Sequence, residues 1–421
     1  MRILWFTNTS SLYEGNPHQY NGGGWIESLE LLLSKQSKLE LAVSFYHKKD
    51  SRSCKKGNTV YYPMLRKKPS PIRYLLNNWK GKIESQSEIL YLLDIVNDFK
   101  PNVIHVFGTE GVFSSIQEFT EIPVVIHLQG LINPYYNAFF PPGFSDLLFL
   151  FNKRYLFDNL LGRGPYFQHK RFKNQADREV KNLKSAKYLM GRTKWDYSVS
   201  KLYNKNVIYF HVDEVLRPDF YLQNLNEKKI EKKIEKKITI VSTISSTVYK
   251  GIDFILKSAK LLKEQTNIEF HWKLIGINGE NKLLKHFEEK LQIKHNKYNI
   301  ECLGVKKTQD LVKLLIQSDL FIHPSYIDNS PNSICEAQIL GLPIIACNVG
   351  GVGSLIKHEV DGILIPANGI YELLSYILDY NENRSKYNEI DINAVKVAKE
   401  RHNKEKIIEK ILFSYREILK G

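Results

Sequence analysis

The sequence predicts an α/β protein built from two doubly wound domains. Short apolar runs rich in β-branched residues alternate with longer helical patterns, as expected for βα units that form parallel sheets. At 421 residues the chain is too long for one typical core, so two domains of roughly 200 residues are expected. A charged run of low complexity, KKIEKKIEKK at 228–237, separates the two sets of βα units and is typical of a solvated linker.

The first domain is expected over residues 1–226. Its predicted helices include Trp25–Ser34 and Ser87–Phe99. Its predicted strands are short apolar runs bounded by polar or turn residues: Ile3–Thr7, Glu40–Phe45, Val60–Tyr62, Val103–Phe107 and Val124–His127.

The second domain is expected over residues 238–400, after a charged linker at 227–237. Helices are predicted between its strands, for example at Gly251–Lys263 and Thr308–Ser318. No strand is predicted after Tyr371, so the helix at 401–421 is expected to pack back on the first domain. The predicted strands are Thr239–Ser242, Phe270–Ile275, Asn299–Cys302, Leu320–His323, Ile344–Ala346 and Gly362–Ile365.

The composition is that of an ordinary soluble protein, with 43% hydrophobic and 25% charged residues. The opening run RILWFT suits a first buried strand better than the apolar part of a signal peptide. No run approaches the roughly 18 apolar residues that a membrane-spanning helix needs. The cysteines lack a Cys-x-x-Cys spacing, so reduced thiols in a cytoplasmic protein are expected and a zinc site is not; they are Cys54, Cys302, Cys335 and Cys347.

The formal net charge of +15 indicates either an anionic partner or a solvated surface without one. No RNA- or DNA-binding motif accompanies the charge, so no nucleic-acid partner is expected. The lysines are spread along the chain, and the Lys/Asn/Ile-rich composition is also compatible with a coding bias. An anionic membrane surface and a surface with no dedicated partner are the two alternatives.

Residues 323–353 hold the densest group of candidate binding residues. Asp328 precedes Asn332 and Ser333, and Glu336 stands eight positions after Asp328. This order predicts a loop that enters a helix, with one carboxylate before the helix and one on its second turn. A helix N-terminus offers free N–H groups and a positive dipole end to an anion, most often a phosphate. The carboxylates can accept hydrogen bonds from hydroxyls, so a sugar nucleotide supplies both kinds of partner.

Three further positions follow predicted strands at the sheet edge where ligands of open α/β sheets bind. The run Asn21–Gly24 opens a helix, and its glycines let a ligand approach the backbone; the alternative is a flexible turn. Lys250 lies where a βα loop enters a helix and can neutralise a diphosphate, although a solvated lysine fits the same pattern. His127 ends an apolar strand and faces the predicted crevice, or is a structural histidine.

Taken together, these residues resemble the retaining GT-B glycosyltransferases of family 4, and most of all the bacterial enzymes that build cell-surface polysaccharides. The resemblance covers most of the chain. It rests on the order and spacing of several segments, none of which is specific alone. These segments are Asn21–Trp25, Ile104–Gly111, Val124–Gly130, Gly191–Tyr197, Val212–Tyr221, Ser245–Phe254 and residues 323–353.

The resemblance implies two Rossmann-like domains that face a central cleft, with the C-terminal helix crossing back to the first domain. It also implies catalytic and donor-binding roles for particular residues. His127 would lie beside the transferred sugar and its reacting carbon. The implied donor contacts are Gly23 and Gly24 beneath the diphosphate, Lys250 neutralising it, the N–H groups of Asn332 and Ser333 at the phosphates, Glu336 at the ribose, Asp328 at the sugar, and loops near Gly276 and Leu303–Val305 at the base.

Two positions depart from the family pattern. Ser245 stands where the family usually has Arg, five residues before Lys250, and Asp328 stands where it usually has Glu. The loss of Arg removes a cation from the diphosphate, so Lys250 and the helix N-terminus would carry more of its charge, or Lys194 would substitute. Asp is one methylene shorter than Glu, so the sugar would bind closer or through water.

The implied reaction is transfer of a sugar from a UDP- or GDP-linked donor to a hydroxyl of a glycan or lipid-linked glycan, with retention. No cofactor and no catalytic divalent metal are expected, because the chain has no Asp-x-Asp pair. Two other classes remain open. A GT-B-fold sugar-nucleotide epimerase or hydrolase would need no acceptor, and a non-catalytic glycosyltransferase-like subunit is made conceivable by Ser245 and Asp328.

The segment Tyr135–Tyr166 is rich in aromatic residues and is followed by Lys170, Arg171 and Lys173. One interpretation is that it grips a lipid-linked acceptor at a membrane, which would make the protein peripheral on the inner face of the plasma membrane. The other is a buried helix pair with a Pro-Pro turn in a cytoplasmic protein.

Overall fold

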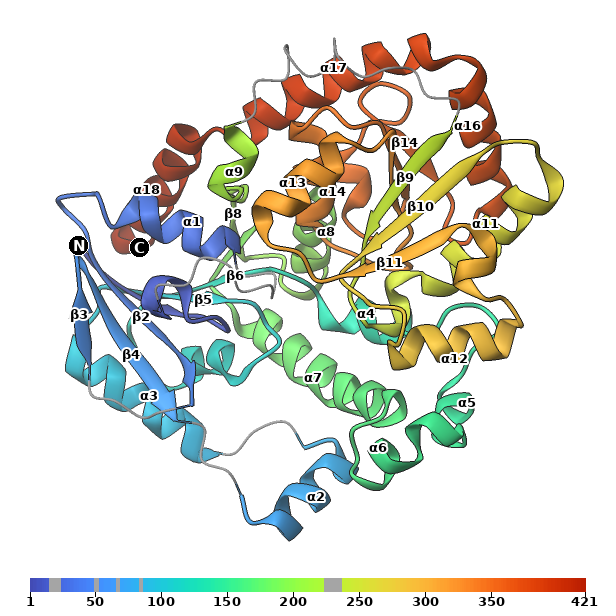
Figure 1. Ribbon diagram of the computed structural model, residues 1–421. Helices are drawn as coiled ribbons and strands as arrows, with labels where there is room; N and C mark the ends of the chain where they lie inside the picture. The colour runs from blue at the N-terminus through green and yellow to red at the C-terminus, as the bar shows by residue number, and fades with distance from the viewer. Residues whose placement is uncertain (15–23, 49–52, 66–68, 83–85, 223–236) are drawn as a thin grey trace. The chain divides into compact units, whose positions relative to one another are not determined.

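The computed structural model describes residues 1–14, 24–48, 53–65, 69–82, 86–222 and 237–421 (Figure 1). These residues divide into two compact units. The linker expected at 227–237 lies outside the described residues, except for Lys237. The first unit holds Met1–Asn137, Phe149–Val215 and His402–Gly421, and the second holds Ala138–Leu148 and Leu216–Arg401.

The first unit is organised around an eight-stranded sheet with the order β3-β4-β2-β1-β5-β6-β7-β8. Neighbouring strands run parallel, except that β3 and β4 pair antiparallel. The chain starts at a central strand and winds first to one side and then to the other, which is the doubly wound arrangement. The strands are β1 (Arg2–Phe6), β2 (Glu40–His47), β3 (Cys54–Lys56), β4 (Thr59–Leu65), β5 (Val103–Phe107), β6 (Val124–His127), β7 (Tyr188–Gly191) and β8 (Ile208–His211).

Side chains of β1 alternate between the two faces of this sheet, as the two-residue period of a strand requires. Ile3 and Trp5 join one core, to which α1 (Gly24–Leu33) contributes Ile26 and Leu29. Leu4 joins the core on the other face, together with residues of α3 (Gln86–Phe99). Because both faces are covered, the strand is apolar from Ile3 to Phe6.

The C-terminal helix α18 (Lys404–Lys420) packs within the first unit. Its buried residues Ile407, Ile411, Tyr415 and Ile418 recur at the spacing of one helix face and belong to the same core as Trp5. The other helical segments of this unit are η1 (Ser11–Glu14), α2 (Pro71–Lys80), η2 (Val112–Glu118), α4 (Ile132–Asn137), η3 (Lys153–Tyr155), α6 (Leu156–Leu160), α7 (Pro165–Ser185) and α8 (Lys194–Tyr203), while α5 (Asp146–Leu150) spans the division between the units.

The segment Gly191–Tyr197 has a structural explanation in the start of α8. The Thr193 hydroxyl accepts a hydrogen bond from the Asp196 N–H at 3.0 Å, and the Asp196 carboxylate accepts one from the Thr193 N–H at 3.2 Å. This reciprocal pair satisfies N–H groups that a helix start leaves without intrahelical partners. A side chain at Gly191 would meet both Asp196 and the Tyr209 hydroxyl, so glycine is required there.

The second unit has a six-stranded parallel sheet with the order β11-β10-β9-β12-β13-β14. Counted along this unit, the order is 3-2-1-4-5-6, the order of dinucleotide-binding folds. β9 and β12 meet at the centre, and the chain leaves them in opposite directions. The strands are β9 (Ile238–Thr243), β10 (Phe270–Ile275), β11 (Ile300–Gly304), β12 (Leu320–His323), β13 (Ile344–Cys347) and β14 (Ile363–Ile365).

Helices connect the strands of the second unit and end it. They are α9 (Pro218–Tyr221), η4 (Val248–Lys250), α11 (Ile252–Gln265), α12 (Lys282–Leu291), η5 (His295–Tyr298), α13 (Thr308–Ile316), α14 (Asn332–Ile339), α15 (Val352–Leu355), α16 (Ile370–Glu382) and α17 (Arg384–Arg401).

The predicted class, α/β with two doubly wound parallel sheets, is confirmed. The sequence prediction missed β3, β7 and β8, which have only three or four residues each. Within the described ranges, no helix is both long enough and apolar enough to cross a membrane.

Candidate functional site

Two loops that follow neighbouring central strands bring Lys250 and Asp328 together in the second unit. Lys250 ends the turn η4 after β9, and Asp328 follows β12, which ends at His323. The winding of the sheet reverses between these two strands. Ligands of open α/β sheets bind at that point, beside the carboxyl ends of the strands. The pair therefore lies where the fold offers a binding site.

Asp328 is held by three groups around its carboxylate. Lys250 Nζ donates a hydrogen bond to Oδ2 at 2.5 Å, His323 Nε2 lies 3.3 Å from the same oxygen, and the Asn329 N–H donates to Oδ1 at 3.1 Å. Burial alone would raise the pKa of Asp328, but the Lys250 ammonium and His323 hold that pKa well below its usual range. Asp328 is therefore ionised at neutral pH beside a cation.

Two glycines let the backbone of this site close on itself. Gly251 follows Lys250 with φ +77°, and a Cβ there would lie 2.1 Å from the Pro324 carbonyl oxygen. Gly350 has φ +52°, and a Cβ there would lie 2.0 Å from the Asp328 carbonyl oxygen. Both positions combine a left-handed backbone with a contact too short for any side chain. The loops after β9, β12 and β13 are thus packed against one another at backbone distance.

Glu336 is paired with Arg217, a residue that the sequence analysis did not assign. Arg217 Nε and Nη2 donate to the same Glu336 oxygen, Oε1, at 3.0 and 2.6 Å. Arg217 Nη1 also donates to the Thr308 hydroxyl at 3.0 Å. Glu336 is 6% exposed, so its charge needs such a partner. Arg217 lies in the Val212–Tyr221 segment, but no spacing rule links it to a carboxylate 119 residues away.

Asn332 and Ser333 are the first two residues of α14, and both are partly exposed. Pro331 precedes them as the N-cap and makes no side-chain capping hydrogen bond. The N–H groups of the first helical turn have no hydrogen-bond partner within the helix, because no helical residue precedes them. The predicted helix start is therefore present, with Glu336 on the second turn.

The loops predicted to hold a base join the ends of β10 and β11. The Gly276 N–H donates to the Gly304 carbonyl at 2.9 Å, and the Gly304 N–H donates to the Ile277 carbonyl at 2.8 Å. Val305 follows and is exposed. Ser245, after β9, shares a 2.6 Å hydrogen bond with the Thr247 hydroxyl. Gly276, Val305 and Ser245 lie beyond the carboxyl ends of β10, β11 and β9, as predicted, and Gly304 is the last residue of β11.

His127 ends β6 in the first unit and is fully buried. Its Nδ1 lies 3.2 Å from His105 Nε2, and His105 Nδ1 lies 2.6 Å from the Tyr415 hydroxyl on α18. Trp5 Nε1 donates to that hydroxyl at 3.1 Å. Burial lowers the pKa of His105 to about 3 and that of His127 well below its usual range, so both rings are neutral.

The other first-unit predictions concern the starts of α1 and α8. Gly24 is the first residue of α1, whereas Gly23 lies outside the described residues. Lys194, expected as a substitute cation, is the first residue of α8. It belongs to a different unit from Ser245.

Glu110, after β5, is a titratable group that the sequence analysis also did not assign. Burial raises the pKa of its carboxyl to about 7, with a further increase from the nearby Glu179. A Cβ at Gly108 would lie 1.9 Å from Glu110 Oε2, so the glycine makes room for this side chain. Arg178 Nη2 donates a hydrogen bond to the Glu110 carbonyl at 2.5 Å. A carboxyl that titrates near neutral pH can exchange a proton there.

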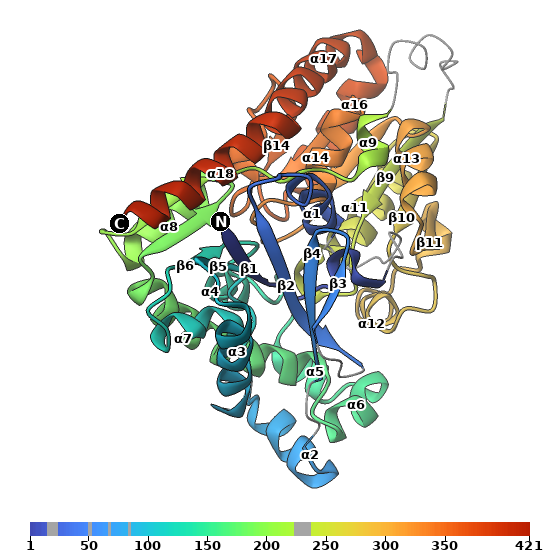
Figure 2. The same cartoon turned by 90° about the vertical axis from the view of Figure 1, so that its left-hand side faces the viewer.

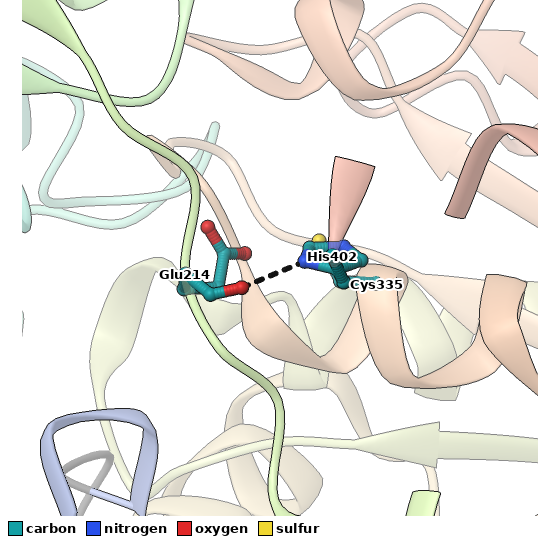
Figure 3. Close-up of side chains that lie close together, drawn as sticks. All are labelled: Glu214, Cys335 and His402. Carbon is teal, nitrogen blue, oxygen red and sulfur yellow. Dashed lines mark hydrogen bonds between the residues drawn. The ribbon is translucent and has the colours of Figure 1, made fainter. Parts of the chain in front are cut away.

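A buried ion pair lies near the end of the stretch Phe149–Val215 of the first unit. Arg192 Nη1 lies 3.5 Å from Glu214 Oε2, with both side chains almost fully buried. The Glu214 carbonyl oxygen also lies 2.9 Å from His402 Nδ1, as the dashed line in Figure 3 marks. This bond ties residue 214 to the chain just before α18, so it anchors the C-terminal segment within the first unit.

The second unit matches a known family. The sequence profile described as "Glycosyl transferases group 1" matches residues 223–397. A 109-residue stretch is 32% identical to the UDP-Gal:alpha-D-GlcNAc-diphosphoundecaprenol alpha-1,3-galactosyltransferase of Escherichia coli. That alignment covers 26% of this chain and 28% of the relative, so it spans little more than a quarter of either protein.

Solved structures resemble the chain over nearly its whole length. Sucrose-phosphate synthase from Thermosynechococcus elongatus superposes with a TM-score of 0.73 at 12% identity, covering 99% of this chain and 98% of that one. Anabaena Alr3699/HepE in complex with UDP-glucose superposes with a TM-score of 0.67 at 14% identity, covering 99% and 100%. At such identities the likeness shows the fold alone. The chain therefore has the two-unit α/β fold of these GT-B proteins, and its second unit carries the sequence profile of the group 1 glycosyl transferases.

Proposed function

We propose that this protein transfers a sugar from a nucleoside-diphosphate sugar to an acceptor hydroxyl, with retention, in the synthesis of a cell-surface polysaccharide. The observation that carries the proposal is the arrangement of Lys250, Asp328 and the start of α14 at the switch point of the second sheet. The profile match falls on the same unit. The relative in Escherichia coli is a galactosyltransferase by name, and the HepE structure holds UDP-glucose.

In this proposal the second unit binds the donor. The N–H groups of Asn332 and Ser333 and the positive end of α14 receive the phosphates. Glu336, held by Arg217, accepts hydrogen bonds from the ribose. The loops at Gly276 and Val305 lie beside the base, which is uracil or guanine. Ser245, after β9 in the same unit, lies beside the diphosphate.

Lys250 and Asp328 have linked roles in the proposed reaction. The difficult step is departure of the diphosphate from an oxocarbenium-like carbon, and cations placed at the leaving oxygens stabilise the developing charge. Lys250 supplies such a cation without a metal ion. Its bond to Asp328 holds both groups in place before the donor arrives, and Asp328 then accepts hydrogen bonds from the sugar hydroxyls. The attacking hydroxyl approaches on the side of the leaving phosphate and gives its proton to an oxygen of that phosphate, so the glycosidic bond forms on the face from which the diphosphate leaves and the anomeric configuration is preserved.

The first unit is proposed to bind the acceptor and the reacting part of the sugar. His127 lies beside the transferred sugar as a neutral ring, consistent with its low pKa. The acceptor is a glycan or a lipid-linked glycan, as the diphosphoundecaprenol in the relative's name suggests. A lipid-linked acceptor would bring the protein to the inner face of the plasma membrane as a peripheral protein.

The test is product analysis with UDP- and GDP-sugars, with and without undecaprenyl- or shorter prenyl-diphosphate-linked saccharides. The proposal predicts a new α-linked product that requires the acceptor. Rapid conversion of the donor alone would instead identify an epimerase or hydrolase. Donor binding without turnover across a broad acceptor panel would identify a non-catalytic subunit, so each outcome selects one class.

A further inference from the structure

Helix α2 carries apolar side chains but buries none of them. None of its ten residues is buried, although Ile72 and Leu76 stand one turn apart on one face and Trp79 follows. Ile72 is 75% exposed. The ends of α2 are well defined. Ser70 caps its start, proline occupies its first position, and Gly81 follows its end in the left-handed region. An ordered helix with no buried apolar face is expected to lie against something outside its own unit.

The segment around α6 in the same unit repeats this pattern. Asn159 points inward and donates to the Phe149 and Leu150 carbonyls. The apolar side chains on the other side face solvent. They are Phe151 (79% exposed), Leu156 (60%), Phe157 (69%) and Leu160 (58%). The sequence analysis gave a buried helix pair as one interpretation of the aromatic segment Tyr135–Tyr166. Phe139, Phe149 and Tyr155 are buried, as that interpretation expects, whereas the four side chains above are exposed.

The two segments lie side by side. Trp79 Nε1 donates to the Leu160 carbonyl at 2.9 Å, and Asn78 Nδ2 donates to the Leu161 carbonyl at 3.1 Å. The Arg163 guanidinium lies 5.4 Å from the centre of the Tyr74 ring. Figures 1 and 2 both draw α2 next to α6. We call residues 71–82 and 151–163 the two-helix surface.

Apolar exposure is concentrated on the two-helix surface. Of the 24 large apolar side chains exposed among the described residues, eight lie within 71–80 and 151–160. A contiguous patch of this kind marks an interaction site rather than ordinary scatter.

The same surface is strongly basic. Its only acidic residue is Asp158, against exposed cations on both segments. The cations are Arg73, Lys80, Lys82, Lys153, Arg154 and Arg163. This charge complements an anionic partner and opposes a second copy of the same surface, because like charges would then face each other.

We infer that the two-helix surface docks the protein on an anionic lipid bilayer, with the exposed aromatic and aliphatic side chains inserted among the headgroups and the cations at the lipid phosphates. This inference specifies the membrane part of the proposed function, yet it does not depend on donor chemistry. Trp79 lies at the boundary between the apolar and basic residues, where tryptophan is enriched at membrane interfaces.

Vesicle co-sedimentation of the full chain tests this inference. Wild type is expected to bind phosphatidylglycerol vesicles at low salt, to be released by high salt, and to ignore phosphatidylcholine vesicles. The double variants Leu156→Ser with Phe157→Ser and Lys153→Glu with Arg154→Glu are expected to lose binding at least tenfold. The matched control is Leu202→Ser with Leu222→Ser, which removes two equally exposed leucines elsewhere and is expected to bind like wild type.

Three results would overturn the inference. The first is binding that falls equally in the control and in the surface variants, and the second is no binding to anionic vesicles at all. The third is a concentration-dependent dimer that the surface variants abolish, since a second copy would then be the occupant. Transfer to a short water-soluble acceptor is expected to be unchanged in every variant, which separates failure of docking from failure of the proposed reaction.

A second, independent observation concerns the hydrogen-bond chain that ends at His127. Trp5 Nε1–H can only donate, so the Tyr415 oxygen accepts from it. The Tyr415 hydroxyl is fully buried, and its own proton would lack an acceptor unless it pointed at His105 Nδ1. His105 then carries its proton on Nε2 and donates it to His127 Nδ1. The remaining position for the His127 proton is Nε2. The direction of these bonds follows from the Trp5 donor together with the need to pair the buried Tyr415 hydroxyl.

We propose that Tyr415 is a positioning residue that fixes His127 as the Nε2–H tautomer, so that His127 presents a hydrogen-bond donor. The role of that donor rests on the proposed function, whereas the tautomer itself does not. The C-terminal helix thereby acts on a ring at the sheet edge through His105.

Long-range proton–nitrogen correlation spectra of protein labelled with ¹⁵N-histidine test the assignment. Wild type is expected to show a protonated Nε2 and an unprotonated Nδ1 at His127. Tyr415→Phe is expected to shift His127 toward the Nδ1–H tautomer. The control Tyr387→Phe removes another buried tyrosine hydroxyl, which binds Asp379 at 2.9 Å, and is expected to leave the His127 signals unchanged. An Nδ1–H tautomer in wild type, or no change in Tyr415→Phe, would overturn the proposal whatever the activity.

Discussion

The Arg217 guanidinium holds one oxygen of Glu336 with two nitrogens, Nε at 3.0 Å and Nη2 at 2.6 Å. The same guanidinium reaches the Thr308 hydroxyl with its remaining nitrogen at 3.0 Å. A planar fork of this kind fixes the direction of a carboxylate, which a single ammonium cannot do. Glu336 is therefore oriented before any ligand arrives.

Replacing Arg217 by Lys is expected to weaken donor binding by roughly tenfold, because Lys keeps the charge but loses the fork. The substitution should weaken binding of a nucleoside diphosphate but not of pyrophosphate, since Glu336 is assigned to the ribose. Titration calorimetry with nucleoside diphosphates and with pyrophosphate measures both. Arg401→Lys is the control, because Arg401 binds Gln338 and the Leu355 carbonyl in the same unit; equal losses in the two variants would remove the specific role of Arg217.

Replacing Lys250 by Met is expected to reduce donor affinity by roughly 10- to 100-fold, the range for losing one charge-assisted hydrogen bond of about 1.5–3 kcal/mol. It should also destabilise the apo protein, because Asp328 loses its principal cation. Asp328→Asn added to Lys250→Met is expected to restore part of the stability and none of the affinity. Denaturant unfolding and calorimetry of the four proteins in this double-mutant cycle provide the measurements.

The matched control for Lys250 is Lys257→Met. Lys257 pairs with the buried Asp253 at 2.9 Å in the same unit, so it reports the cost of losing an ion pair near α11. Donor affinity that fell as far in Lys257→Met as in Lys250→Met would contradict the assignment of Lys250 to the diphosphate.

Lengthening Asp328 to Glu is expected to change which sugar is transferred more than how tightly the nucleotide binds. The added methylene moves the carboxylate towards the sugar, while Lys250 and the helix start remain. Competition between pairs of donors that share one nucleotide measures the preference directly. Identical sugar preferences in wild type and Asp328→Glu would show that Asp328 does not contact the sugar.

Glu110 predicts a particular pH dependence of stability. Its pKa is raised in the folded state, to about 7, from an ordinary value of 4.5. The folded protein therefore binds more protons than the unfolded chain between these values, and the contribution of Glu110 is lost as the pH rises from about 4.5 to 7. Glu110→Gln should therefore become more stable relative to wild type as the pH rises over that range. A difference in unfolding free energy between Glu110→Gln and wild type that did not change with pH would contradict this buried environment for Glu110.

The sequence predicted the features that depend on local order along the chain. The alternation of strands and helices places the loops after β9 and β12 at one sheet edge, so Lys250, Asp328 and the start of α14 could be grouped without coordinates. Glycines at 251 and 350 explain why those loops can pack closely.

The features it did not predict depend on contacts between distant residues. Arg217 and Glu336 are 119 positions apart, and His105 and Tyr415 are 310 apart. Neither pair has a periodicity that would reveal it. Helix α2 was also missed, although Ser70, Pro71 and Gly81 mark its ends. The strands β7 and β8 were missed although β6, which also has four residues, was predicted, so length alone does not explain the difference.

The most direct test of the central claim is the thermal stability of the protein across a panel of nucleoside diphosphates and their sugars. A donor at 100 times its dissociation constant adds about 2.7 kcal/mol to the stability of the folded state. We expect UDP or GDP and one of its sugars to raise the melting temperature of wild type by several degrees, and to leave Lys250→Met unchanged. No rise with any nucleotide, or an equal rise in Lys250→Met, would contradict a donor site built on Lys250, Asp328 and Glu336.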